Sequence, residues 1–240
     1  MSAPRPSRRT SRVPASAALA AVAALALLTG CANSPGEVPP TGVDELTVPT
    51  PSPDPADFVD TVDNEWFPLE RGSVQRWRVL GGAGGGVRVV VAPEPRQVAG
   101  VAATVVRSRA TLDPEAGGRG WGTGAQSDFF AQDRDGNVWW LGRAGEWEAG
   151  VDGAQAGLAV PADPRLGDGY RMALLDGVVE DRAEVTGVDE DVVRLEVFTG
   201  DDAASGLGAD ATQEVVLQRG IGPTRVERYD EVLELLTDPA

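Results

Sequence analysis

Residues 192–199 read Val-Val-Arg-Leu-Glu-Val-Phe-Thr, and they give the clearest indication of the fold class. Val193, Leu195 and Val197 alternate with two charged residues, so the apolar side chains recur at a spacing of two. That spacing places one set of side chains on each face of a β-strand. The stretch therefore predicts a strand with one face in a core and the other toward solvent.

On both sides of residues 192–199, further segments are rich in Val, Thr and aromatic residues. Clusters of Gly, Pro and Asp between these segments predict turns. These predicted strands are 73–80, 86–92, 102–112, 126–132, 137–143, 170–175, 178–188, 212–219 and 223–229. They indicate a mainly β fold, an antiparallel meander curved into a half-barrel or closed into a barrel or sandwich. We expect few helices: a short one over 57–64, and over 231–236 either a helical turn or a last strand.

Composition excludes several chemistries before any motif is considered. The chain has 240 residues, a formal charge of -16, no His, one Cys and no Lys. It therefore has no Ser-His-Asp triad, no Schiff-base lysine, no CxxC pair and no intrachain disulfide. So acidic a chain is also a poor partner for nucleic acid, whose phosphates need clustered basic charge. We expect no cofactor.

The first 31 residues carry the clearest motif. Four arginines precede an apolar run over 15–28, which is too short to span a bilayer and is typical of an export signal. The run ends in Leu28-Thr29-Gly30-Cys31 and resembles the lipobox of bacterial lipoproteins. The resemblance implies cleavage before Cys31 and acyl chains on that cysteine, a stable anchor. A plain secretory signal is the alternative, and the arginine pair in residues 8–9 leaves twin-arginine export open.

Three regions follow from this motif. Residues 1–30 are the predicted signal peptide, 31–56 the lipidated Cys with a Pro-rich tether, and 57–240 a single extracytoplasmic β-rich domain. The predicted location is the outer face of the cell membrane, with the membrane as partner through the anchor. Loss of the four signal arginines leaves 17 basic and 37 acidic residues, so the mature charge is -20.

Aromatic residues are the candidates for a ligand pocket. If Trp139 and Trp140 lie in one strand, they point to opposite faces, so one faces the core and the other faces solvent, a lid or a ligand. The full candidate set is Trp66, Trp139, Trp140, Trp147 and Tyr170. The alternative is that both faces of the strand are covered. The Gly- and Pro-containing stretch 147–170 is expected to be a long loop that forms a lid or a pocket wall.

Two weaker candidates are polar. Asp133, Asp135 and Asn137 have the spacing of the first ligands of a calcium loop, but the later Gly and Glu are missing. Asp135-Gly136 is also a strong hairpin-turn pair, which is the favoured interpretation. A two-carboxylate glycan hydrolase is a further alternative, although 37 acids make chance pairs abundant.

Several strings together resemble an uncharacterised group of secreted or lipid-anchored bacterial proteins that is common in actinobacteria. They are Asn64 to Leu69 with Gly72, Ala131 to Trp140, Trp147 to Ala154, Pro161 to Pro164 with Gly167 and Tyr170, Glu180-Asp181, and Gly220-Ile221-Gly222. The resemblance implies no activity. Leu217-Gln218-Arg219 and Arg143 depart from the group's usual residues at those positions. At the level of fold, the chain also resembles lipoprotein carriers with acyl-binding half-barrels.

These observations favour a non-enzymatic module that binds a lipid or another hydrophobic ligand. The alternatives are an envelope structural domain with a filled core that contacts another protein, and the carboxylate hydrolase. An open apolar cavity distinguishes the first interpretation from the second.

Overall fold

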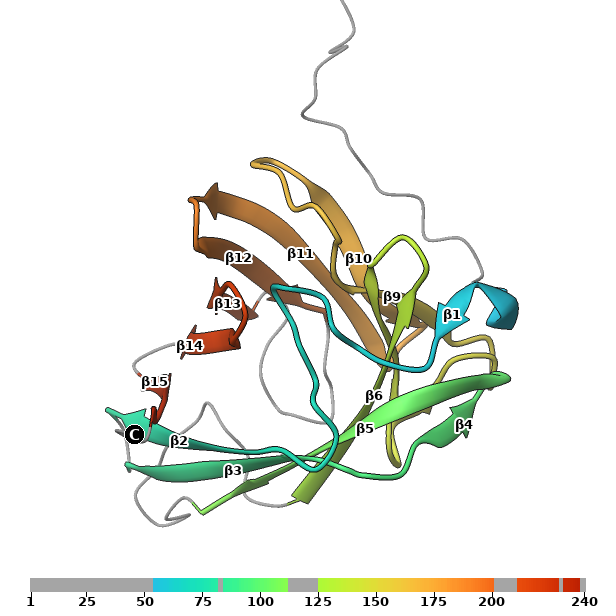
Figure 1. Cartoon of the computed structure of the whole chain (residues 1–240), viewed down its shortest axis with the longest axis horizontal. Helices are drawn as coiled ribbons and strands as arrows, with labels where there is room; N and C mark the ends of the chain where they lie inside the picture. Colours follow the sequence, from blue (N-terminus) through green and yellow to red (C-terminus); the bar gives the residue numbers. More distant parts are fainter. Residues whose placement is uncertain (1–53, 82–83, 112–124, 201–210, 229–230, 238–240) are drawn as a thin grey trace, which may run out of the picture. The chain divides into compact units, whose positions relative to one another are not determined.

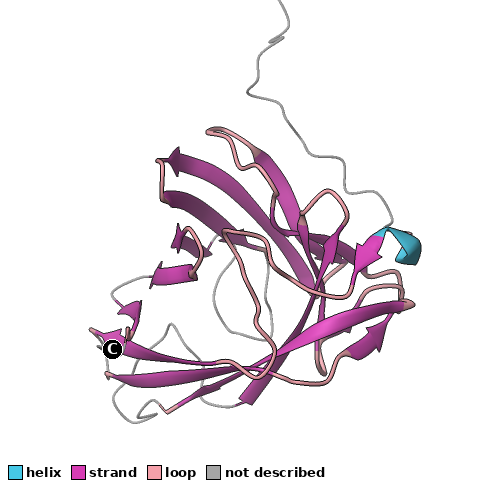
Figure 2. Cartoon of the chain, in the orientation of Figure 1, coloured by secondary structure: helices cyan, strands magenta, loops and turns pink. Residues whose placement is uncertain are grey.

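A computed structural model of the protein describes residues 54–81, 84–111, 125–200, 211–228 and 231–237. The chain divides between Thr41 and Gly42, and every described residue belongs to the second part, Gly42–Ala240. Nearly all of its regular structure is β-strand, as Figure 2 shows. No helix within the described ranges is long and apolar enough to cross a membrane.

Twelve antiparallel strands close into a barrel (Figure 1). They are β2 (Val74–Leu80), β3 (Gly85–Val91), β5 (Val101–Ala110), β6 (Ala125–Asp133), β7 (Val138–Arg143), β9 (Gln155–Val160), β10 (Gly169–Leu175), β11 (Val179–Val188), β12 (Val192–Thr199), β13 (Ala211–Gln218), β14 (Gly222–Arg228) and β15 (Glu231–Leu235). Around the ring the order is β6-β5-β3-β2-β15-β14-β13-β12-β11-β10-β9-β7, and pairing of β6 with β7 closes it. All of these pairings lie within Gly42–Ala240, so this part carries the whole hydrogen-bonded ring.

Three short strands and one turn of helix lie outside the ring. They are β1 (Phe58–Val59), β4 (Arg96–Val98), β8 (Trp147–Glu148) and the 3-10 turn η2 (Pro55–Asp57). β1 pairs with β6, β4 with β5 and β8 with β7. The three strands pair with consecutive members of the ring, β5 to β7, and β7 and β9 are buried on both faces.

The predicted mainly β fold is confirmed, in its closed-barrel form. The stretch 192–199 is β12, and its alternating Val193, Leu195 and Val197 are buried, while Arg194 is exposed. The hairpin around Asp135-Gly136 is also confirmed, because it joins β6 to β7 and Gly136 has φ 90°. Of the two alternatives for 231–236, the last strand is correct.

The predicted helix over 57–64 is wrong. Asp54 caps η2 by accepting a hydrogen bond from the amide of Ala56, and the helix ends at Asp57. The chain then pairs in register with β6, Phe58 opposite Asp133. β-Branched residues follow, and tertiary pairing overrides the weak local preference for helix.

The predicted long loop over 147–170 is wrong as well. It contains β8 and β9, and β9 is a full member of the ring between β7 and β10. Its residues after Gln155 are buried on both faces and are mostly small and apolar, so they show no alternation. Periodicity alone cannot recognise such a strand. Gly157 allows the close approach to β10, because an added Cβ would lie 2.5 Å from the carbonyl carbon of Met172.

The two faces of the barrel wall differ in chemistry on β14, β15 and β2. Arg225, Glu234 and Arg78 lie directly opposite one another, and Glu234 forms ion pairs with Arg225 at 2.9 Å and Arg78 at 3.3 Å. This charged row is on the outer face. Alternation therefore directs the neighbouring row, in which Leu233 pairs with Val79, to the inside of the barrel.

Candidate functional site

All five aromatic pocket candidates are buried. The exposed fraction of Trp66 is 3%, of Tyr170 4%, and of Trp139, Trp140 and Trp147 5% each. Trp66, Trp139 and Tyr170 lie in one hydrophobic cluster, and Trp140 and Trp147 in another. The prediction that Trp139 and Trp140 point to opposite faces of one strand agrees with this division.

The tryptophans of β7 pack against neighbouring rings and one cation. The rings of Trp140 and Trp147 meet edge to face, with centroids 5.0 Å apart. Phe130 stacks near Trp140 at 6.5 Å, and the guanidinium of Arg143 lies over the Trp140 ring at 4.9 Å. Both faces of β7 are thus covered, which is the alternative that the sequence had left open.

Arg143 is held by carboxylates. Its Nε donates to Asp128 at 2.9 Å, and a second nitrogen lies 3.5 Å from Glu146. Burial disfavours the charge of Arg143, but Asp128 and Glu146 outweigh it and raise the pKa of Arg143. Arg143 therefore fastens β7 to β6.

Tyr170 combines a buried ring with a weakly bonded hydroxyl. Its O–H donates to the carbonyl of Ala159 across 3.3 Å. Burial raises the pKa of Tyr170 above its usual value, and the nearby carboxylate of Asp168 adds to the shift. The folded state therefore favours the neutral phenol of Tyr170 over the phenolate.

The weak calcium candidates form part of the hairpin. Asp133 accepts hydrogen bonds from the amide and side chain of Asn137, both at 2.9 Å, and from the indole N–H of Trp139 at 2.8 Å. Asn137 in turn accepts from the amide of Ala162 at 2.9 Å. Asp135 is exposed at the turn. Asp133 and Asn137 thus direct oxygens at protein N–H donors, and among the described residues no three acids, His or Cys are grouped to hold a metal.

Asn64 is the centre of a second polar cluster. Its side-chain oxygen accepts from the amides of Trp66 at 2.8 Å and Phe67 at 3.1 Å. Its amide nitrogen donates to the carbonyls of Gly136 at 2.8 Å and Pro161 at 3.3 Å. The backbone N–H of Asn64 donates to Gln132 on β6 at 2.7 Å. One buried side chain thus joins the N-terminal segment, the β6–β7 hairpin and the segment after β9.

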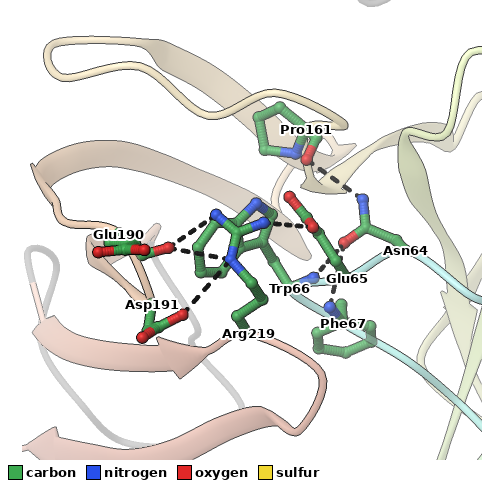
Figure 3. A network of polar contacts seen from close by, with 8 residues as sticks. All are labelled: Asn64, Glu65, Trp66, Phe67, Pro161, Glu190, Asp191 and Arg219. Atoms are coloured by element: carbon green, nitrogen blue, oxygen red, sulfur yellow. Dashed lines mark hydrogen bonds and ion pairs between the residues drawn. The ribbon is translucent and has the colours of Figure 1, made fainter.

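Arg219 continues this fastening on the other side of the N-terminal segment (Figure 3). Its guanidinium lies over the ring of Trp66 at 4.3 Å and forms an ion pair with Glu65. It also donates to the carbonyl of Glu190 at 2.8 and 2.9 Å and lies 3.7 Å from Asp191. The segment 64–67 is therefore fastened between the residues that precede β12 and follow β13 on one side and the β6–β7 hairpin on the other.

We call the residues Asn64, Glu65, Trp66, Gln132, Asp133, Asn137 and Arg219 the clamp. It brings together several of the strings singled out in the sequence, which are far apart along the chain. Its polar atoms are largely engaged with one another or with backbone groups. The clamp thus gives these strings a role in holding the fold together.

Glu146, Glu148 and Asp168 are among the acids that the glycan-hydrolase alternative could use. Glu148 pairs with Arg96 at 2.6 Å, and Glu146 with Arg143. Asp168 is buried and accepts from the amide of Arg165 at 2.9 Å. These contacts give each of the three acids a structural partner. The predicted lipidation residues Leu28, Thr29, Gly30 and Cys31 lie outside the described residues.

The structure also has a hollow that was not predicted from the sequence. It has a volume of about 400 Å³ and lies at the ends of β2 and β3. It is lined by Arg76, Trp77, Arg78, Gly85, Gly86, Val87, Arg88, Thr111 and Leu236, and contains none of the five predicted aromatics. A sequence signal was present, because Arg76 and Arg78 are two residues apart in a strand and so share one face.

Comparisons with protein-family models, with curated proteins and with solved structures found no match to this chain.

Proposed function

We propose that the chain is an extracytoplasmic lipoprotein, anchored in the cell membrane through Cys31, whose barrel is a non-enzymatic module that binds a lipid or another hydrophobic ligand. The lipobox-like Leu28-Thr29-Gly30-Cys31 supports the anchor. We also propose that the chain is related to the actinobacterial group that its motifs resemble.

The observation that carries the binding function is an incompletely covered apolar inner wall. Trp77, Val79 and Leu233 form a buried cluster on the inward row of β2 and β15. The apolar residues packed against it, Val87, Val89, Val226 and Leu235, are only half-buried. A ring of twelve strands is wider than the eight-stranded barrels whose interiors side chains can fill or that hold one small ligand. Half-buried apolar side chains facing such an interior suit an apolar guest.

The second candidate, an envelope interaction domain with a filled core, is favoured by a different observation. The five predicted aromatics are buried in packed clusters and the clamp is internally satisfied. The two candidates thus apply to different sectors of one barrel. The carboxylate hydrolase stays a weaker proposal, since Glu146 and Glu148 are engaged with arginines.

Ligand uptake is tested by filling the interior. Val89 and Val90 are adjacent on β3, both half-buried, and lie on opposite faces of the strand. We expect Val89→Trp to weaken uptake of a fluorescent fatty acid by about tenfold or more, a change of 1.4 kcal/mol, and the matched Val90→Trp to leave it unchanged. Absence of uptake by the parent protein, or equal loss in both variants, contradicts the proposal.

The anchor is tested in cells of a lipid-modifying host fed an alkyne fatty acid. The full chain should become labelled and should fractionate with membranes. Cys31→Ala should abolish the label, and the neighbouring Ser34→Ala should retain it. Label that persists after Cys31→Ala would refute the lipoprotein assignment.

A further inference from the structure

Three arginines lie side by side on three neighbouring strands. The register places Arg76 of β2 opposite Arg88 of β3, and Arg88 opposite Arg109 of β5. All three are exposed. Directly opposed residues in an antiparallel sheet are about 5 Å apart at Cα, and like charges in such positions destabilise the pair. The three guanidinium groups therefore repel one another, and a bound anion would relieve this repulsion.

Two more arginines lie on the same face. Arg78 follows Arg76 at a spacing of two, and Arg107 precedes Arg109 at the same spacing. Arg78 is paired with Glu234. In the part of the chain that the structure describes, the guanidinium groups of Arg88, Arg107 and Arg109 form no ion pair or hydrogen bond. We call these five residues the arginine face.

The surplus of positive charge here is a property of the local sequence. Residues 71–112 contain seven arginines and a single acid, Glu94, so this stretch has a formal charge of +6 in a chain of -16. Although 36 of the 37 acids lie elsewhere in the sequence, none of the described acids pairs with Arg88, Arg107 or Arg109. The arginine face is therefore complementary to an anion outside the chain.

Apolar residues border the arginine face. Val74 and Leu80 lie on the same side of β2 as Arg76 and Arg78, with exposed fractions of 45% and 37%. Leu236, which follows β15, is 44% exposed and donates its amide to the carbonyl of Arg76. The hollow between them has a glycine, Gly86, where β3 faces Arg78. Arginines beside exposed aliphatic side chains match the boundary between lipid headgroups and acyl chains.

We propose that the arginine face docks on an anionic phospholipid surface. The guanidinium groups bind lipid phosphates, because their planar N–H donors match phosphate oxygens in pairs. Val74, Leu80 and Leu236 contact the acyl boundary beside them. The inference deepens the proposed membrane location, and it requires no lipid on Cys31, so it is tested without the anchor.

The test measures co-flotation of residues 42–240, which contain the whole hydrogen-bonded ring, with vesicles. One set is phosphatidylcholine alone, and the other contains phosphatidylglycerol and phosphatidylcholine in equal parts. The variant Arg88→Gln/Arg109→Gln removes two charges from an opposed pair. The matched control is Arg171→Gln/Arg182→Gln, which also removes two charges from an opposed pair. Arg171 of β10 lies opposite Arg182 of β11, and within the described residues neither arginine forms an ion pair.

We expect the parent to float only with the phosphatidylglycerol vesicles, the face variant to bind about tenfold more weakly, and the control to bind like the parent. Thermal unfolding verifies that each variant is folded. Equal loss in both variants, or equal binding to both vesicle types, overturns the proposal. Binding of inorganic pyrophosphate to the parent without binding to vesicles also overturns it, and assigns the face to a soluble anion. Fatty-acid uptake into the barrel is measured separately, so either proposal can fail alone.

Discussion

Two sectors of the same barrel use their polar residues in opposite ways. In the clamp sector, around β6, β7 and β9, Asn64, Asp133 and Asn137 each bond to other parts of the chain, and both faces of β7 and β9 are covered. In the sector of β2, β3 and β5, arginines stand exposed in a row, and Arg88 and Arg109 have no partner among the described residues. The clamp sector therefore serves the fold, while the arginine face is available for contact with another molecule.

The largest expected effect concerns Gly157, where β9 of the clamp sector lies very close to β10. A methyl group at Gly157 would overlap the carbonyl oxygen of Arg171 on β10. We expect Gly157→Ala to lower the free energy of unfolding by about 3 kcal/mol, the scale of overpacking. Urea denaturation measures it. The control is Gly169→Ala on β10, where an added Cβ meets nothing within 4 Å.

A second prediction concerns Asn64 at the centre of the clamp. Asn64→Ala removes four hydrogen bonds made by the side chain and leaves buried backbone groups unsatisfied. We expect a loss of about 2 to 3 kcal/mol in the free energy of unfolding. Asn64→Asp should keep the bonds to Trp66 and Phe67 but lose those to Gly136 and Pro161. An unfolding free energy of Asn64→Ala equal to that of the exposed-site control Gln155→Ala contradicts the clamp's role.

Much of the fold is predictable because most strands have one buried face and one solvent-exposed face. β12, β11 and β2 alternate, so Val193 and Trp77 are identified as inward from sequence spacing alone. β9 is not predictable in this way because neither face contacts solvent. The clamp strings were recognisable as motifs, but Asn64 and Pro161 are 97 residues apart, and only the closed ring brings them together. The arginine face was overlooked because whole-chain acidity obscures a local surplus.

The third prediction uses the pH dependence of stability. Without His or Lys, only Cys31, the terminal amino group and two tyrosines titrate between the acids and the arginines. Burial raises the pKa of Tyr170, so the folded state keeps its proton where the unfolded chain, with a pKa of about 10, loses it. Stability should be full below about pH 10 and then fall by up to about 1.4 kcal/mol per pH unit. Tyr170→Phe should flatten this alkaline decline in urea titrations, and an unchanged slope would contradict the assignment.

The smallest expected effect concerns the arginine face. Because Arg88 and Arg109 repel each other across β3 and β5, Arg88→Gln/Arg109→Gln should leave the free energy of unfolding unchanged or raise it by about 0.5 kcal/mol. The rise should shrink as salt screens the charges. A marked loss of stability would show that these arginines serve the fold, which would remove the contrast between the two sectors.

Hydrogen exchange of the protein with and without phosphatidylglycerol vesicles tests the contrast between the sectors most directly. We expect vesicles to slow amide exchange in β2, β3 and β5 and to leave exchange in β6, β7 and β9 unchanged. Protection confined to the clamp sector, or no protection at all, would contradict it.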